Sequence, residues 1–582
     1  MEFKLFAETA FELEKTSSRL GMVDILSKLF KKADKNTIQK LIYLLQGRVA
    51  PPFEGIEVGM GEKFVERSIS IATGYTEKEV ESLFRKKGDL GLVAEALLEK
   101  KKQLAFSEQD LTVGEVFDSL IKIAKTSGEG SQEKKVKYLA ELLNRASPLE
   151  GRYLVRIPLA NLQLGVGDPT MMDALSVAIK GDTSLRQEIE TAYNLSSDLG
   201  LVAKNLYEGK KKLAEIKLFN PIRPALAERE NDPKAILERH GTTMADLKLD
   251  GFRLQIHKKG DKVMLFSRRL ENMTDSFPEV IETIKKNVKA DEAIIDSEAL
   301  AYNESTGELY PFQYTIQRKR KHGVEKMAEE LPLHVFAFDI MYLNGESLID
   351  LPYKKRRELL EKIIKKDGIS VIENITTSDV KELESYFKKA IEIGAEGLVC
   401  KDPNSIYKAG TRGFYWIKFK RSYKGELADT LDLVIIGYFL GKGARAEFKF
   451  GGLLCAVYDE DSDTFKSITR VGSGFSEEMM VKLRKLLEKI KVKEKPARVD
   501  SIIEPDFWVK PMYVITVKAD EITESPLHTA GRKGDTGYAL RFPRMIGDIR
   551  EDKKPEDATT VSEIIRMFKL QKHTSIESNP EA

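Results

Sequence analysis

The segment KLDGFR, residues 248–253, brings a lysine, a carboxylate and a glycine together at the start of an alternating, strand-like run. A strand period of two places Lys248 and Asp250 on the same side, and Gly251 lets a ligand approach the backbone closely. A lysine amine attacks only when it is unprotonated, and a partly desolvated site with cationic neighbours lowers its pKa. The K-x-D-G pattern is short enough to arise by chance, so its meaning depends on the residues that accompany it.

A second group of charged side chains lies in the run FYWIKFK, residues 414–420. Alternation along a strand puts Trp416, Lys418 and Lys420 on one face. A purely structural strand would rarely place two ammonium groups together, whereas phosphoryl transfer needs positive charge around phosphate oxygens. The pattern therefore predicts a phosphate site on this face.

Two carboxylates, Glu298 and Glu396, follow or interrupt apolar, strand-like segments of the sequence. Burying an ionised carboxylate is costly unless it is paired or bound to a metal, and hard oxygen ligands suit Mg²⁺. The two glutamates are therefore candidate magnesium ligands. Structural ion pairs with the lysines are the alternative.

The elements that must position these side chains fall into three regions. Apolar residues recur at helical spacing from residue 1 to about 215, and a charged stretch with prolines at 216–233 ends that pattern. Strand-like and helical runs then alternate, and beyond about residue 425 short β runs predominate, with one amphipathic helix and a loose tail after about 571. We therefore predict a multidomain protein with an all-α domain at 1–215, an α/β (α+β) domain at 216–424 and a small β-barrel domain at 425–582.

Composition limits the class of protein. The net charge is only +2, because 94 Lys and Arg are balanced by 92 Asp and Glu, so any basic surface for nucleic acid must be local. Cys400 and Cys455 cannot build a four-thiolate zinc site or a disulfide framework, which favours a reducing cytoplasm. The N-terminus is typical of an amphipathic helix rather than an export signal, and no apolar run is long enough to predict a membrane span. The 32% of charged residues suggests a thermophile protein.

Further short motifs follow KLDGFR in a fixed order. They are SRRLEN (267–272), IDSEA (295–299), FAFDIMYLNGE (336–346), AEGLVCK (395–401), WIKFK (416–420) and RFPRMIGDIREDK (541–553). This ordered set resembles the signature motifs of covalent nucleotidyltransferases and is most similar to ATP-dependent DNA ligases of the archaeal and eukaryotic replicative type. The resemblance covers nearly the whole chain, including the helical N-terminal region.

The resemblance implies a three-step reaction that uses ATP and Mg²⁺ and acts on nicked duplex DNA in replication, recombination and repair. Lys248 would attack the α-phosphate of ATP, form lysyl-AMP and expel pyrophosphate. The AMP would pass to the 5′-phosphate of a nick, and attack by the neighbouring 3′-hydroxyl would release AMP and join the strands. The three regions would then be a helical DNA-binding domain, an adenylation domain and an OB-fold domain with a C-terminal helix and tail.

The resemblance also assigns roles to individual residues. Lys418 would hold the α-phosphate with help from Lys420, Phe338 would stack on adenine, and Glu396 is a firmer metal candidate than Glu298, which would also contact ribose. For any single arginine a surface ion pair is the alternative. The nucleotide contacts implied are Asp246, Arg253, Arg268, Glu298, Phe338, Arg412, Lys418, Lys420, Arg550 and Lys553.

Two of these assignments carry a further expectation. Asp246 stands where the family usually has glutamate, and its shorter side chain alters the expected adenine or ribose contact. Arg550 and Lys553 resemble the last family motif, which reaches the pyrophosphate when the small barrel closes over the site. They would be essential for self-adenylation and less important for sealing.

The segment 127–157 resembles the helical domain that grips duplex DNA in large ligases. Gly128, Gly130 and Ser131 would offer backbone amides and a hydroxyl to phosphates at a helix start. Arg152 and Arg156, one helical turn apart, would reach the same DNA strand.

Two other places bear on DNA binding. A second contact loop, residues 162–170, carries Gln163 where the family has arginine, which predicts one phosphate contact fewer. Arg541 and Arg544 would add to the DNA surface of the OB-fold domain, and a rim ion pair is the alternative for Arg544.

QLAF, residues Gln103 to Phe106, lies where archaeal ligases carry a short sliding-clamp motif, but here a second aromatic residue is absent. A leucine and a phenylalanine buried in the protein core would give the same sequence pattern, so clamp binding is a hypothesis. We expect the protein to act as a monomer.

The sequence is also compatible with other functions. An RNA ligase or a GTP-using capping enzyme shares the lysine chemistry but usually lacks the long helical N-terminal region, and an NAD-dependent ligase would bring a cysteine-rich zinc finger. A non-catalytic nucleic-acid-binding protein on the same scaffold would have no need of Lys248, Lys418, Lys420 and Glu298 together.

Overall fold

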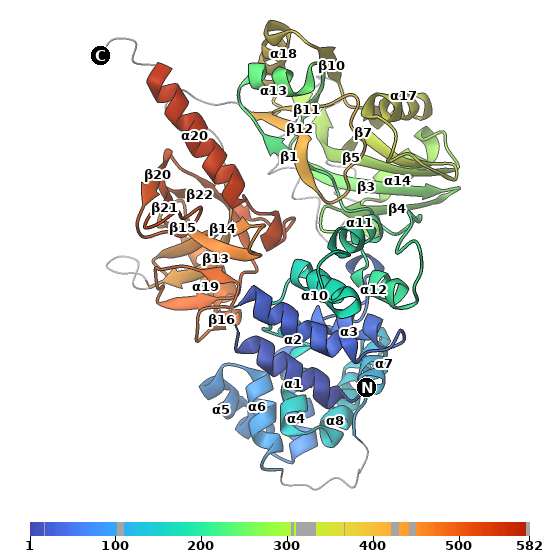
Figure 1. Cartoon of the computed structure of the whole chain (residues 1–582). Coiled ribbons are helices and arrows are strands. Elements are labelled where there is room, and N and C mark those ends of the chain that lie inside the picture. Colours follow the sequence, from blue (N-terminus) through green and yellow to red (C-terminus); the bar gives the residue numbers. More distant parts are fainter. Residues whose placement is uncertain are drawn as a thin grey trace. The chain divides into compact units, whose positions relative to one another are not determined.

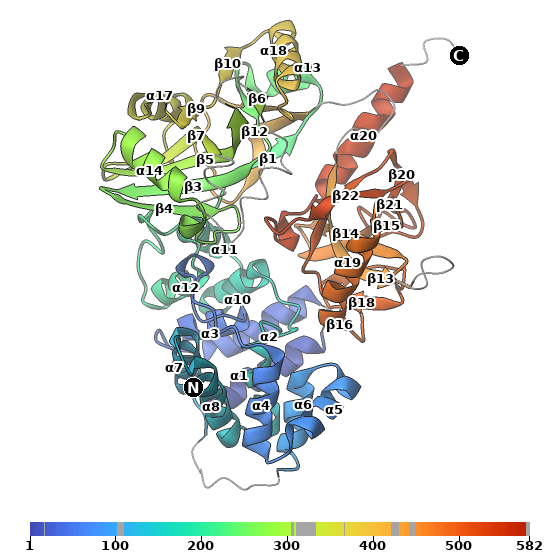
Figure 2. The same ribbon diagram turned by 180° about the vertical axis from the view of Figure 1, so that it is seen from behind.

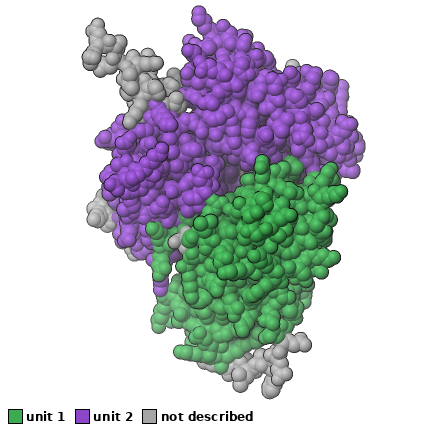
Figure 3. Space-filling view, viewed as in Figure 1, with its two compact units in different colours: residues 1–215, 494–498 green, residues 216–493, 499–582 purple. Residues whose placement is uncertain are grey.

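The structure, a computed structural model, describes the chain except for residues 17, 102–109, 304–307, 310–332, 366, 421–429, 441–449 and 578–582. The described part divides into two compact units, coloured separately in Figure 3. One comprises residues 1–215 with 494–498, and the other comprises residues 216–493 with 499–582. Within the described residues, no helix has the length and apolar character that a membrane crossing requires.

The first unit is helical, as predicted (Figure 1). Capping boxes, in which a side-chain oxygen and a glutamate satisfy the first free amides, begin α5, α7 and α9. The helices are α1 (Phe3–Glu14), α2 (Arg19–Lys31), α3 (Ile38–Leu45), α4 (Glu62–Thr73), α5 (Glu77–Lys87), α6 (Leu90–Leu98), α7 (Val113–Lys125), α8 (Ser131–Arg145), α9 (Pro148–Arg156), α10 (Asp168–Lys180), α11 (Arg186–Ser196) and α12 (Leu199–Tyr207).

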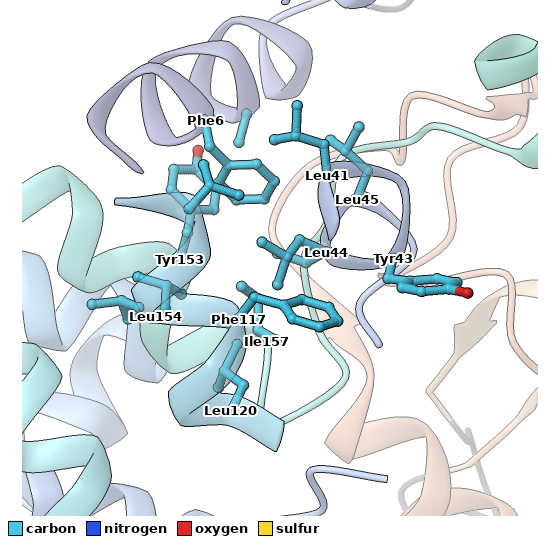
Figure 4. Packing of buried hydrophobic residues seen from close by; sticks show 14 of the residues in the cluster. Phe6, Leu41, Tyr43, Leu44, Leu45, Phe117, Leu120, Tyr153, Leu154 and Ile157 are labelled. Atoms are coloured by element: carbon cyan, nitrogen blue, oxygen red, sulfur yellow. The ribbon is translucent and has the colours of Figure 1, made fainter. Parts of the chain in front are cut away.

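The apolar faces of these helices form one core (Figure 4). Phe6 of α1 meets Tyr153 of α9 edge to face, with ring centres 6.4 Å apart, and Tyr43 of α3 stacks on Phe117 of α7 at 6.2 Å. Burial of each such large side chain contributes about 1.5–3 kcal/mol, so α1, α3, α7 and α9 are held together by contacts between residues far apart in sequence.

The first part of the second unit contains two β-sheets (Figures 1 and 2). One runs β4-β3-β5-β7-β8, with β6 and β9 attached, and packs against α14 and α17; the other runs β1-β12-β11-β2-β10 and packs against α13 and α18. Their bounds are β1 (Leu226–Arg229), α13 (Pro233–His240), β2 (Thr243–Lys248), β3 (Phe252–Lys259), β4 (Lys262–Ser267), α14 (Pro278–Asn287), β5 (Glu292–Asn303), β6 (Glu308–Leu309), β7 (Leu333–Leu343), β8 (Glu346–Ser347), α17 (Tyr353–Ile363), β9 (Ile369–Val371), β10 (Asn374–Thr377), α18 (Val380–Glu392), β11 (Gly397–Lys401) and β12 (Arg412–Lys420).

The last part of the second unit is rich in sheet, as predicted. Its main sheet runs β16-β18-β13-β14-β15-β17, with β19 pairing to β13 and to β22, and β20 and β21 form a separate hairpin. The elements are β13 (Leu431–Phe439), β14 (Gly452–Asp459), β15 (Thr464–Val471), α19 (Glu477–Lys489), β16 (Lys491–Val492), β17 (Val499–Asp500), β18 (Phe507–Val509), β19 (Val514–Lys518), β20 (Glu521–Ser525), β21 (Gly537–Arg541), β22 (Arg544–Ile549) and α20 (Val561–Glu577).

The C-terminal helix is longer than predicted. α20 packs against β14 and β20 and continues to Glu577, so the expectation of a loose tail from about residue 571 is wrong for 571–577. No glycine or proline interrupts this stretch before Pro580, and helix propagation costs little once the preceding turns are formed.

Candidate active site

Three charged residues of the predicted site meet where β2, β11 and β12 pair. Gly397 at the start of β11 pairs with Lys248 on one side and with Lys420 on the other. Glu396 precedes it, and its carboxylate accepts hydrogen bonds from Lys248 Nζ and from Lys420 Nζ, the latter at 3.0 Å. Burial alone would raise the pKa of Glu396, but the two ammonium groups hold that pKa well below its ordinary value.

Glycine at position 397 makes this convergence possible. A Cβ there would lie 2.3 Å from the carbonyl oxygen of Phe419, and its φ of +143° suits only glycine. The close approach of β11 and β12 therefore depends on the missing side chain, which also brings Lys248 and Lys420 to the same carboxylate.

Two further carboxylates, Asp250 and Glu298, lie near Lys248. Burial and the neighbouring Glu396 raise the pKa of Asp250 to about 6, against the opposing effect of Lys248. Burial raises the pKa of Glu298 to about 7, although it accepts a hydrogen bond from Gly251 N at 3.1 Å. These carboxylates lack full compensation for their charge, as expected of a site that receives a cation.

These carboxylates could hold only part of a metal shell. Within the described ranges, no group of three or more His, Cys, Asp or Glu side chains has metal-binding geometry. A fit to Mg²⁺ therefore requires water and phosphate oxygens as additional ligands, which is usual for that ion. The donor set of Glu298 and Glu396 is compatible with this arrangement.

A cavity of about 250 Å³ connects these groups, somewhat smaller than the roughly 300–1,000 Å³ of typical small-molecule sites. Its walls come from both parts of the second unit. They include Lys248, Asp250, Arg253, Arg268, Glu298, Phe338, Glu396, Lys401, Arg412, Trp416, Lys418, Lys420, Asp432, Arg550, Lys553 and Glu563. The fold thus brings the predicted nucleotide residues around one space.

Aromatic side chains form one end of the cavity. The rings of Phe338 and Trp416 meet edge to face at 6.1 Å, and the guanidinium of Arg253 lies 5.3 Å from the Phe338 ring centre. Arg253 also pairs with Asp296, Nη2 to Oδ2 at 2.6 Å. This end of the cavity offers flat apolar surfaces with fixed positive charge, which suits a purine base.

Asp246 lies behind this end and is only 1% exposed. Its carboxylate pairs with Lys401 Nζ at 2.7 Å, accepts a hydrogen bond from Tyr353 OH at 2.9 Å and lies 3.3 Å from Arg357 Nη1. Lys401 also donates to the carbonyl oxygen of Phe338 at 3.1 Å. Asp246 also lines the cavity, so its contact with the nucleotide stays a prediction, although internal donors share its carboxylate. Sequence reasoning missed Lys401, whose burial has no local signal.

Arg412 and Lys418 share a partner that the sequence did not indicate. Glu563, in the first turn of α20, lies 2.5 Å from Arg412 Nη1 and 3.8 Å from Lys418 Nζ. Burial lowers the pKa of Lys418 far below its ordinary value, although Glu563 opposes this shift. The sequence signal at Glu563 is a capping pattern, Thr560 to Glu563, which marks a helix start but does not reveal the second role.

The residues of the last motif also lie at the cavity. Arg550 binds Asp552 in a bidentate pair, with distances of 2.8 and 2.7 Å, and Lys553 forms an ion pair with Asp432 of β13. The structure therefore brings Arg550 and Lys553 to the same space as Lys248, although about 300 residues separate them in sequence.

The residues of the first unit that were predicted to contact DNA differ in their exposure to solvent. Gly128 and Gly130 have φ angles of +87° and +71° with open space around them, and Ser131 begins α8. In contrast, Arg152 and Arg156 are only 9% and 3% exposed.

Both arginines are engaged inside the helical core. Arg152 pairs with Glu95 and Glu14, and Arg156 pairs with Glu14 and with Asp89, the last at 3.2 Å. The expectation that they reach DNA phosphates is therefore wrong for this structure, because buried guanidinium groups are held by their carboxylate partners. Gln163 joins the same network through a hydrogen bond to Asp89 at 2.8 Å.

Arg541 and Arg544, in contrast, are exposed near the turn between β21 and β22. Their nearest carboxylates are Glu521 at 3.6 Å and Asp520 at 3.8 Å, distances that are long for ion pairs. Phe542 between them is 65% exposed. The expected clamp segment, Gln103 to Phe106, lies outside the described residues.

Comparison with known proteins agrees with this site. Family models described as DNA ligase N terminus, ATP dependent DNA ligase domain and ATP dependent DNA ligase C terminal region match residues 2–176, 224–420 and 446–553. A probable DNA ligase of Dictyoglomus turgidum is 50% identical over 99% of this chain and 100% of its own length. DNA ligases of Nitrosopumilus maritimus and Saccharolobus solfataricus are each 45% identical, over 98% and 99% of this chain and the same shares of their own. The chain therefore belongs to the ATP-dependent DNA ligase family, whose members use ATP to seal nicks in DNA.

Proposed function

We propose that Lys248 is the nucleophile with which this ligase takes AMP from ATP and passes it to the 5′-phosphate of a nick. The observation that carries the proposal is the grouping of Lys248 and Lys420 around Glu396 at the wall of one cavity. Other charged residues of the cavity supply the positive charge that a triphosphate requires.

The first step transfers AMP from ATP to Lys248. The Lys248 ammonium loses a proton to solvent, because only the neutral amine is a nucleophile. The amine nitrogen then bonds to the α-phosphorus, and the bond from that phosphorus to the pyrophosphate oxygen breaks. Lys418 and Arg412 are placed to neutralise phosphate oxygens once Glu563 releases them.

The later steps reuse the same groups. The 5′-phosphate of the nick takes AMP from Lys248 as the phosphorus–nitrogen bond breaks, and the 3′-hydroxyl then displaces AMP to form the new phosphodiester. Mg²⁺, when bound, supplies positive charge to the phosphate oxygens, and Glu298 and Glu396 are its proposed ligands.

The domain assignment is part of the proposal. We assign residues 1–215 to a DNA-binding domain, 216–424 to an adenylation domain and 425–582 to an OB-fold domain. The helical character of the first region, the cavity lined by the predicted nucleotide residues and the antiparallel sheet around β13 support this assignment. The exposed backbone at Gly128 and Gly130 and the exposed Arg541 and Arg544 are the proposed phosphate contacts.

The proposal also covers partners beyond DNA. The QLAF segment, 103–106, is proposed to bind a sliding clamp, and unchanged capture of clamp by Phe106→Ala would contradict this. We propose that the protein acts as a cytoplasmic monomer. Light scattering of the purified chain, with and without nicked DNA, would measure its oligomeric state.

The experiment that tests the proposed nucleophile is covalent labelling. The protein is incubated with α-labelled ATP, α-labelled GTP or labelled NAD, with Mg²⁺, and then denatured; we expect label from ATP that disappears in Lys248→Ala. Lys354→Ala, which changes an exposed lysine of the same unit, is the matched control. Labelling by GTP alone would instead favour a capping enzyme, and absence of any label would favour a non-catalytic DNA-binding protein.

A further inference from the structure

Asp432, at the start of β13, is a partly buried carboxylate that the proposed mechanism does not use. One of its oxygens, Oδ2, forms an ion pair with Lys553. The other, Oδ1, lies 3.6 Å from Arg550 Nη1 and accepts a hydrogen bond from Thr516 Oγ1 at 2.9 Å. A single carboxylate thus contacts both cations of the last motif.

The backbone of Asp432 is fixed as firmly as its side chain. Its amide donates to Thr559 Oγ1 at 3.0 Å, and its carbonyl oxygen accepts from Thr559 N at 2.8 Å. Antiparallel pairing with Thr516 of β19 holds the same residue from the other side. The carboxylate therefore has little freedom to move, which makes it suitable for orienting flexible lysine and arginine side chains.

The surrounding charges explain why such a carboxylate is needed. Arg268 and Arg550 face Lys553, and the carboxylates of Asp432, Asp552 and Asp557 lie in the same group. Burial lowers the pKa of Lys553, the two arginines lower it further, and Asp432 opposes them. Without Asp432 the ammonium group would lose its nearest negative partner in a crowded cationic site.

We propose that Asp432 is a positioning residue for the first step, holding Lys553 and Arg550 toward the triphosphate while Lys248 attacks it. This inference rests on the proposed role of the last motif in self-adenylation. Asp432 does not itself bind phosphate, because its negative charge would repel it. Its effect is therefore confined to the step in which Lys553 and Arg550 act.

The test separates the first step from sealing. Asp432→Asn keeps the shape and removes the charge; we expect lysyl-AMP formation from labelled ATP to slow by about tenfold or more, which corresponds to one pKa unit of lost charge interaction. Sealing of a nick that already carries 5′-AMP should change by less than about twofold, because that step does not need pyrophosphate contacts. Asp500→Asn, at an exposed carboxylate of β17, is the matched control.

A pH profile distinguishes positioning from mere structural support. In Asp432→Asn the alkaline limb of the adenylation rate should move to lower pH, because Lys553 loses its proton more readily, and Asp432→Glu should restore the wild-type limb. Thr516→Val, which removes one hydrogen bond to the carboxylate, should give a smaller loss of rate and serves as the second variant if Asp432→Asn unfolds.

The outcomes are distinguishable. The inference would be overturned if Asp432→Asn slowed lysyl-AMP formation and sealing equally, or if the alkaline limb of its pH profile did not move. It would also be overturned if Asp432→Asn formed lysyl-AMP at the wild-type rate while Lys553→Ala formed it slowly. If Lys553→Ala and Arg550→Ala form lysyl-AMP at the wild-type rate, the proposed role of the last motif fails, and the inference about Asp432 fails with it. Thr516→Val at the wild-type rate would contradict the part assigned to that hydrogen bond.

Discussion

Replacing Glu563 by glutamine removes the negative charge that Arg412 and Lys418 share at the first turn of α20. Arg412 and Glu563 have side chains only 9% and 4% exposed, so solvent screens their pair little. Burial would raise the pKa of Glu563, but Arg412 and Lys418 hold that pKa well below its ordinary value. Phosphate oxygens in the cavity would therefore compete with this carboxylate for the two cations.

The size of the effect follows from that competition. Charges 2.5 Å apart attract by several kcal/mol even at an effective dielectric constant of about 20, and desolvation consumes much of this attraction. Taking about 1.5 kcal/mol, the lower end of the net range for hydrogen bonds to charged groups, Glu563→Gln should lower the KM for ATP in self-adenylation roughly tenfold. The protein without ATP should at the same time unfold at a lower temperature, because Arg412 stays buried with a weaker partner.

The assay is the rate of lysyl-AMP formation as a function of ATP concentration in a single turnover. Glu478→Gln changes an exposed glutamate in the first turn of α19 and is the matched control. An unchanged or higher KM in Glu563→Gln, with normal folding, would refute the idea that the carboxylate competes with ATP.

Three further outcomes follow from the geometry. The pKa values of Asp250 and Glu298 are raised to about 6 and about 7, so the two groups favour folding at low pH, and this contribution is lost as the pH rises through those values. The Mg²⁺ concentration for half-maximal adenylation should accordingly be higher at pH 6 than at pH 8. An equal requirement at both pH values would speak against the metal assignment. Gly397→Ala should lower the free energy of unfolding by about 1–3 kcal/mol or more and reduce the rate of adenylation, because the added Cβ meets the Phe419 carbonyl oxygen. Gly472→Ala, whose added Cβ has open space around it, should do neither. Urea unfolding of the two variants measures the difference. Arg156→Ala should lower the free energy of unfolding by about 3–5 kcal/mol, because the partly buried Glu14 and Asp89 each lose a charged partner. A variant of wild-type stability with weak DNA binding would restore the phosphate-contact hypothesis.

The nucleotide site was largely predictable because its residue types are unusual for their positions. Alternation correctly placed Trp416, Lys418 and Lys420 at one cavity. The meeting of Lys248 and Lys420 at Glu396, however, depends on the strand order β12-β11-β2, which no local pattern encodes. The strand period of two therefore predicts on which face of the strand a side chain lies. Its neighbours on adjacent strands depend on the order of the strands in the sheet.

The mistaken residues show the limit of spacing arguments. Arg152 and Arg156 are one turn apart whether that helix face meets DNA or the protein core. Their partners Glu14 and Glu95 lie in other helices, and Asp89 caps the start of α6. The partner of Asp246, Lys401, was likewise missed, because it comes from a strand that the sequence alone does not place beside Asp246. Buried ion pairs between distant residues leave no periodic signal.

The cavity takes its walls from residues as far apart as Ala225 and Glu563. During synthesis the lysine that accepts AMP leaves the ribosome hundreds of residues before Arg550, Lys553 and the first turn of α20. A growing chain would therefore be unable to charge itself with AMP efficiently until its final elements have emerged and folded. Adenylation of newly made protein would thus report that nearly the whole second unit has assembled.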